Sequence, residues 1–79
     1  MARVLLFGRL ADVAGWRERQ VEAASLDGLR RRLTEGDGRL GEALSGPGVQ
    51  AAVDQTLVRG DALLTAASEV AFLPPMSGG

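Results

Sequence analysis

The sequence predicts an α+β fold, in which one face of a mixed sheet packs on a single main helix. Strand-compatible apolar runs lie near both ends of the chain, at 3–7 and 70–73, and the longest stretch with helical spacing, 25–35, lies between them. Two further short apolar segments, 49–53 and 56–58, give the order β, β, α, β, β, with a hairpin at each end. We therefore expect the first and last strands to pair in parallel at the centre of the sheet.

The first strand, 3–7, is apolar on both of its sides. Val4 and Leu6 share one parity, and Leu5 and Phe7 share the other. A strand of this kind must be covered on both faces, one of them by the domain's own core.

A short helical turn and an exposed edge strand follow. Residues 10–14 fit one helical turn that ends at Gly15. Residues 16–22 then fit a second strand whose two parities are both polar, which is typical of an exposed edge.

The main helix begins after Ser25, a good N-cap residue, and runs to about Glu35. Leu26, Leu29 and Leu33 recur at i, i+3 and i+7, so the helix presents one buried stripe.

The segment after the main helix contains further turn signals. Gly36 is a plausible helix stop, and residues 40–44 fit a short second helix before the loop 46–48. Asp54-Gln55 has the length of a two-residue hairpin connection, although neither residue is glycine.

Composition excludes several classes of active site. The 79 residues carry a net charge of −1 and contain no Cys, no His and no Tyr. Disulfides, thiol nucleophiles, Cys/His metal sites and imidazole acid–base catalysis are therefore excluded, and an autonomous enzyme is disfavoured. With no apolar segment of membrane-spanning length, we expect a soluble protein of the cytoplasm.

The last six residues, Pro74-Pro75-Met76-Ser77-Gly78-Gly79, form the most informative segment. Two prolines end sheet pairing and favour an extended exit, and two glycines keep the end of the chain thin. We expect a domain at 1–73 followed by an extended, flexible tail at 74–79. At about 3.3–3.6 Å per residue the tail reaches roughly 20 Å, enough to place a terminal carboxylate inside another protein. The alternative is an ordinary frayed terminus.

Strand parity leaves three large apolar side chains on the face that the helix does not cover. They are Phe7, Leu57 and Leu73, next to the start of the tail. Such a patch predicts a partner interface, and the alternative is a second small core under the turn at 10–14.

The segments 4–10, 51–58 and 69–79 resemble the small subunits of molybdopterin synthase, the sulfur carriers of molybdenum cofactor synthesis. The resemblance covers essentially the whole chain and is most specific in the last eleven residues. It implies the ubiquitin-like β-grasp fold, which agrees with the element order above.

The resemblance also implies a role for the tail. A ubiquitin-activating-like adenylyltransferase would use ATP to adenylate Gly79, and a sulfur donor of the cysteine desulfurase or rhodanese type would convert it to a thiocarboxylate. The tail, with Gly78 giving clearance, would then enter the large synthase subunit of a heterotetramer and deliver sulfur to cyclic pyranopterin monophosphate. The chain itself would bind no cofactor or metal. The implied partner interface consists of Phe7, Leu57, Leu73, Pro74, Pro75, Met76 and Ser77.

Two departures from the family pattern affect turns only. Ala67-Ser68 stand where a Gly-Asp turn is common, and Asp54 stands where Asn is common.

The alternatives in function are a related β-grasp carrier for thiamine, cysteine or tRNA thiolation, and a ubiquitin-like binding module or protein modifier.

Overall fold

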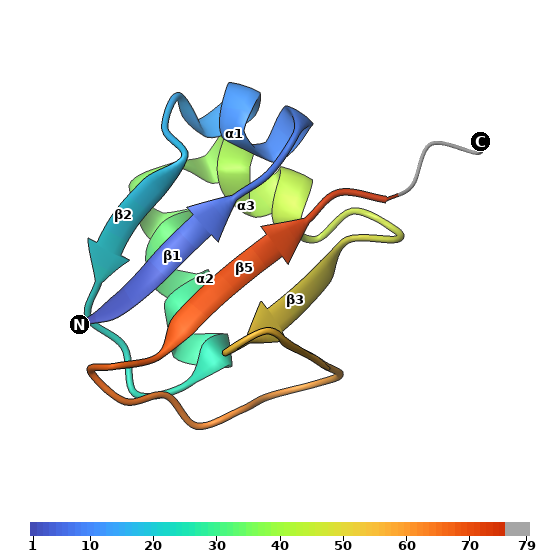
Figure 1. The fold of residues 1–79 in the computed structure, drawn as a ribbon. Helices are drawn as coiled ribbons and strands as arrows, with labels where there is room; N and C mark the ends of the chain where they lie inside the picture. The colour runs from blue at the N-terminus through green and yellow to red at the C-terminus, as the bar shows by residue number, and fades with distance from the viewer. Residues whose placement is uncertain (76–79) are drawn as a thin grey trace.

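The computed structural model describes residues 1–75, which form a five-stranded sheet with three helices (Figure 1). The strand order is β2-β1-β5-β3-β4. In Figure 1 the helices α2 and α3 lie behind the sheet and α1 lies near the end of β1. The elements are β1 (Ala2–Leu6), α1 (Arg9–Ala14), β2 (Glu18–Val21), α2 (Leu26–Gly36), α3 (Gly38–Leu44), β3 (Gln50–Val53), β4 (Thr56–Val58) and β5 (Glu69–Leu73).

The predicted parallel pairing of the first and last strands is confirmed. β1 lies beside β5 with Val4 opposite Val70 and Leu6 opposite Phe72. The other strand pairs are antiparallel, and β5 is the middle strand of the five. The second strand is an edge, as expected, but it is shorter than the predicted 16–22.

The core lies between the sheet and α2. The alternate strand residues Val4, Leu6, Val70 and Phe72 are buried on the helix side. They share one hydrophobic cluster with the predicted stripe Leu26, Leu29 and Leu33, and with residues of α1 and α3. Burial of one parity on each strand therefore fixes which face of the sheet remains open.

The ends of α2 show one confirmed cap and one different stop. The Ser25 hydroxyl accepts a hydrogen bond from the Gly28 N–H at 3.1 Å, as expected of an N-cap. Gly36 is the last helical residue rather than a left-handed stop. Asp37, in an extended conformation, ends α2 and immediately caps α3, because its carboxylate accepts hydrogen bonds from the Arg39 and Leu40 N–H groups.

None of the helices within residues 1–75 has the length and apolar character needed to cross a membrane.

Candidate functional site at the root of the tail

The side of the sheet turned away from α2 faces the viewer in Figure 1. The strand register gives this side an apolar row. The strand register places Leu5 opposite Ala71, Ala71 opposite Ala52, and Ala52 opposite Leu57. The row therefore crosses β1, β5, β3 and β4. We call the apolar part of this surface the open face, and it consists of Leu5, Phe7, Ala52, Leu57, Ala71 and Leu73.

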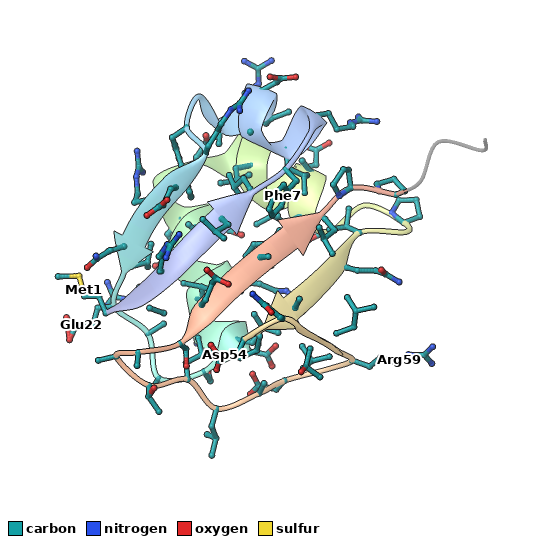
Figure 2. The ribbon with its side chains drawn as sticks, viewed as in Figure 1. Met1, Phe7, Glu22, Asp54 and Arg59 are labelled. Atoms are coloured by element: carbon teal, nitrogen blue, oxygen red, sulfur yellow. The ribbon has the colours of Figure 1, made fainter. Side chains whose placement is uncertain are left out.

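Two of the large side chains of the open face are exposed. Phe7 is 45% exposed and Leu57 is 58% exposed, and Leu73 is half-buried at the end of β5. Figure 2 shows Phe7 at the end of β1, beside the point where the chain leaves β5. The alternative that these three side chains fill a second core under residues 10–14 is wrong, because Phe7 and Leu57 are exposed.

The opposite end of the same face is charged. Arg3 lies between two carboxylates, with its Nε 3.0 Å from Glu18 and one guanidinium nitrogen 3.7 Å from Glu69. Because Arg3 and Glu69 lie at the start of β1 and β5, this polar end is remote from the tail. The apolar surface thus covers the middle of the sheet and the end from which the tail departs.

Two glycine loops flank the first residues of the tail. Gly8, which follows β1, has a φ of +56°, and a Cβ placed there would lie 3.0 Å from Cγ of Pro74. Gly48, which precedes β3, has a φ of +81°, and a Cβ there would lie 2.6 Å from Cβ of Pro75. β1 and β3 are the two neighbours of β5, so the loops approach the chain from both sides.

The structure gathers part of the predicted site. Phe7, Leu57 and Leu73 lie on one face, and Pro74 and Pro75 continue directly from β5. The predicted sulfur-bearing Gly79, together with Gly78, Met76 and Ser77, lies outside the described residues.

Sequence reasoning missed five residues of this region. Leu5, Ala52 and Ala71 complete the open face, and strand alternation could have included them. Gly8 and Gly48 were recognisable as loop residues, but their contacts with the two prolines join distant parts of the chain.

The acidic side chains away from the open face include one, Asp61, with a structural role. No cluster of three acidic side chains within residues 1–75 could hold a metal ion. The Asp61 carboxylate accepts hydrogen bonds from the N–H groups of Asp27 at 2.8 Å and Ala62 at 2.9 Å, and these bonds lower the pKa of Asp61. This carboxylate therefore supports the start of α2 rather than the open face.

Comparison with known proteins places the chain in a family. Residues 4–79 match the ThiS family. The chain is 37% identical over 81 aligned positions to the molybdopterin synthase sulfur carrier subunit of Escherichia coli strain K12, with all of both chains covered.

Solved structures agree on the fold. The crystal structure of small archaeal modifier protein 1 from Haloferax volcanii is 24% identical and superposes with a TM-score of 0.87, covering 99% of this chain and 98% of that one. The solution structure of the corresponding protein from Methanosarcina acetivorans is 22% identical, also with a TM-score of 0.87, and covers 99% and 95%. These likenesses and the mixed sheet confirm the ubiquitin-like β-grasp prediction. The chain therefore belongs to the ThiS family of ubiquitin-like sulfur carriers.

Proposed function

We propose that this protein is the sulfur carrier of molybdopterin synthesis, with the carboxylate of Gly79 as its sulfur-bearing group. The single observation that supports this most is the position of the open face. Its apolar side chains extend from Leu57 on β4 to Phe7 and Leu73, which lie where the chain leaves β5 toward the Gly-Gly end. Full-length similarity to the Escherichia coli sulfur carrier subunit supports the choice of pathway.

The chemistry begins on an activating partner. A carboxylate is a poor electrophile because its charge is delocalised. A ubiquitin-activating-like adenylyltransferase therefore uses ATP to form an acyl-adenylate at Gly79 and releases pyrophosphate. The terminal sulfur of a persulfide on a cysteine desulfurase or rhodanese-type donor then displaces AMP and forms an acyl disulfide. A thiol reductant cleaves that disulfide and leaves the thiocarboxylate.

Sulfur transfer takes place on the large synthase subunit. The open face, including Phe7, Leu57 and Leu73, docks on that subunit, while residues 74–79 enter its pocket as an extended segment. Burial of the exposed apolar side chains offsets the ordering of the tail. The thiocarboxylate sulfur then forms a bond to a carbon of cyclic pyranopterin monophosphate, and water cleaves the resulting thioester and restores the Gly79 carboxylate. Two carriers in a heterotetramer supply the two sulfurs of a dithiolene.

In this scheme the partners supply the catalytic groups. The chain has no Cys, His or Tyr, and its nine cationic side chains are all arginine. The nucleotide and the catalytic cations are accordingly placed on the activating enzyme and the large subunit. The chain binds no cofactor of its own and works in the cytoplasm.

Intact-mass spectrometry tests the proposal. The chain is incubated with the activating enzyme, ATP and a sulfur source, and we expect the mass increase of one oxygen replaced by sulfur. Addition of the large subunit and the pterin should restore the original mass. A variant with one alanine added after Gly79 should show no mass increase. Ser77→Ala, which keeps the tail length, should show both the increase and its reversal.

Other outcomes would contradict the proposal in distinguishable ways. A thiocarboxylate that the large subunit fails to consume would indicate a carrier for another thiolation pathway. An adduct with lysine side chains of other proteins, without sulfur transfer, would indicate a protein modifier.

A further inference from the structure

We propose that Gly8 and Gly48 are positioning residues that set the direction in which the tail leaves the sheet. Because neither glycine has a Cβ, the rings of Pro74 and Pro75 can pack close to the backbone at these two positions. The effect on sulfur transfer rests on the function proposed above, whereas the contact itself does not.

Gly48 makes the tighter contact. A Cβ at this position would lie 2.6 Å from Cβ and 3.5 Å from Cα of Pro75. A Cβ atom does not approach a non-bonded carbon atom so closely. Cβ of proline also cannot move away freely, because the ring holds it to the backbone. A side chain at position 48 would therefore displace Pro75 or the loop 46–48.

Gly8 makes a milder contact of the same kind. A Cβ there would lie 3.0 Å from Cγ of Pro74, and the next ring atoms of Pro74 are 3.9 Å away. Because Cγ is the outer atom of the ring, a change of ring pucker relieves part of this clash. We therefore expect a graded response, larger at Gly48 than at Gly8.

The topology explains why two such contacts fix a direction. β5 lies between β1 and β3, and each of these neighbours contributes one glycine beside the departing chain. Two consecutive prolines are already restricted in φ and behave as a short stiff segment. Contacts on both sides of that segment leave its first residues little freedom, so the rest of the tail starts from a defined position.

The chain offers a matched control for backbone strain. Gly60 has a φ of +79°, close to the +81° of Gly48, but a Cβ there would meet no atom within 4 Å. Gly48→Ala and Gly60→Ala therefore both place an alanine at a positive φ of nearly the same value, which is unfavourable in both loops. They differ in whether the new methyl group meets a proline.

The first measurement observes the contact directly by NMR. The sequence has three prolines, so labelling proline with carbon-13 gives three spin systems. We expect a nuclear Overhauser effect between the Gly48 Hα and Pro75 Hβ protons. Gly48→Ala should shift the Pro75 resonances, and Gly60→Ala should leave them in place.

The second measurement separates positioning from docking. In steady-state sulfur transfer with thiocarboxylated carrier, Gly48→Ala should leave KM for the carrier within about twofold, because the open face is unchanged. Its kcat should fall by about tenfold or more, since a misplacement of 1 Å at a reacting group can cost on the order of 100-fold. Gly60→Ala should retain both parameters.

A rescue experiment tests the clash itself. Pro75→Gly removes the Cβ that an alanine at position 48 would meet, whereas Pro75→Ala keeps it. Gly48→Ala should therefore lower kcat in the Pro75→Ala background and add no further loss in the Pro75→Gly background.

Unshifted Pro75 resonances in Gly48→Ala, or equal effects of the Gly48 and Gly60 variants, would overturn the contact. Shifted resonances with an unchanged kcat would overturn the positioning role. If the wild-type chain accepts no sulfur at all, the proposed function fails, and the NMR result still decides whether the glycines hold the prolines.

Discussion

Asp54 and Gln55 form the turn between β3 and β4, and both have positive φ values, +50° and +70°. Positive φ is unfavourable for residues with a Cβ, although aspartate tolerates it better than most. Asp54 also ties the hairpin to the central strand, because its carboxylate accepts a hydrogen bond from the Glu69 N–H at 2.9 Å. The two turn residues thus differ in what a glycine would change.

We expect Gln55→Gly to raise the free energy of unfolding by up to about 1 kcal/mol. It relieves roughly 1–2 kcal/mol of backbone strain and loses part of that gain to chain entropy. Asp54→Gly is the control, because it also removes the hydrogen bond to Glu69, and we expect a net loss of about 0.5–1.5 kcal/mol. Urea unfolding measures both, and the same sign for the two variants would contradict this account.

Asp61 gives a pH dependence with a definite sign. Its pKa is lowered in the folded chain, first by the hydrogen bond from the Asp27 N–H and then by that from Ala62. The unfolded chain therefore binds the proton more readily than the folded chain does. The stabilisation is fully present above the ordinary aspartate pKa of about 4 and is lost as the pH falls through the lower folded value.

Urea unfolding between neutral pH and acid should show this dependence. The free energy of unfolding of the wild type should fall more steeply below about pH 4 than that of Asp61→Asn, which carries no titrating group at this position. Parallel pH profiles for the two proteins would rule out the assignment to Asp61.

At the scale of the elements, the closest approach of α2 and α3 depends on a glycine. Gly41 is buried on α3, and a Cβ there would collide with the side chain of Thr34 on α2. α2 and α3 can pack this closely because Gly41 has no side chain where α3 meets Thr34.

Gly41→Ala should therefore lower the free energy of unfolding by about 1–3 kcal/mol, the usual range for an overpacked core. Gly38→Ala in the same helix is the matched control, since nothing lies within 4 Å of its Cβ position. It should be neutral or stabilising by up to about 1 kcal/mol, because alanine is the better helix former. Thermal or urea unfolding measures both variants. Equal free energies of unfolding for Gly41→Ala and Gly38→Ala would contradict the close contact with Thr34.

Elements with a local signal were predictable from the sequence. The leucine stripe of α2, the Ser25 cap and the parity of the first strand depend on neighbouring residues, and the structure bears them out. Contacts between distant residues left no such signal. The hydrogen bond from the Asp27 N–H to the Asp61 carboxylate at 2.8 Å, for example, joins residues that are 34 positions apart.

The candidate site divides in the same way. Alternation along single strands placed Phe7, Leu57 and Leu73 on one face before any register was known. The two glycines beside Pro74 and Pro75 emerge only once β1, β5 and β3 lie side by side, because strand order is a property of the whole sheet.

For the whole molecule, docking and folding should be separable on the open face. Leu57 is 58% exposed, so Leu57→Asp should change the free energy of unfolding by less than about 1 kcal/mol. If the open face docks on the large synthase subunit, the same change should weaken binding by at least about 2 kcal/mol, as at an interface hot spot.

Leu63→Asp provides the control for that measurement. Leu63 is 89% exposed and lies in the segment between β4 and β5, outside the open face. Titration calorimetry with the large subunit should give wild-type affinity for this variant. Equal weakening by both substitutions would show that general surface charge, and not the open face, governs association.

The parallel pairing of β1 with β5 makes the last strand of the domain the neighbour of the first. The sheet is therefore complete only when residues 69–73 have paired with both β1 and β3. An unfolded copy would still carry Gly78 and Gly79, but it would lack the arrangement of β1, β3 and β5 from which the tail departs. Under the proposed function, an activating enzyme that engages the sheet and the chain end together would therefore act on folded chains in preference to unfolded ones.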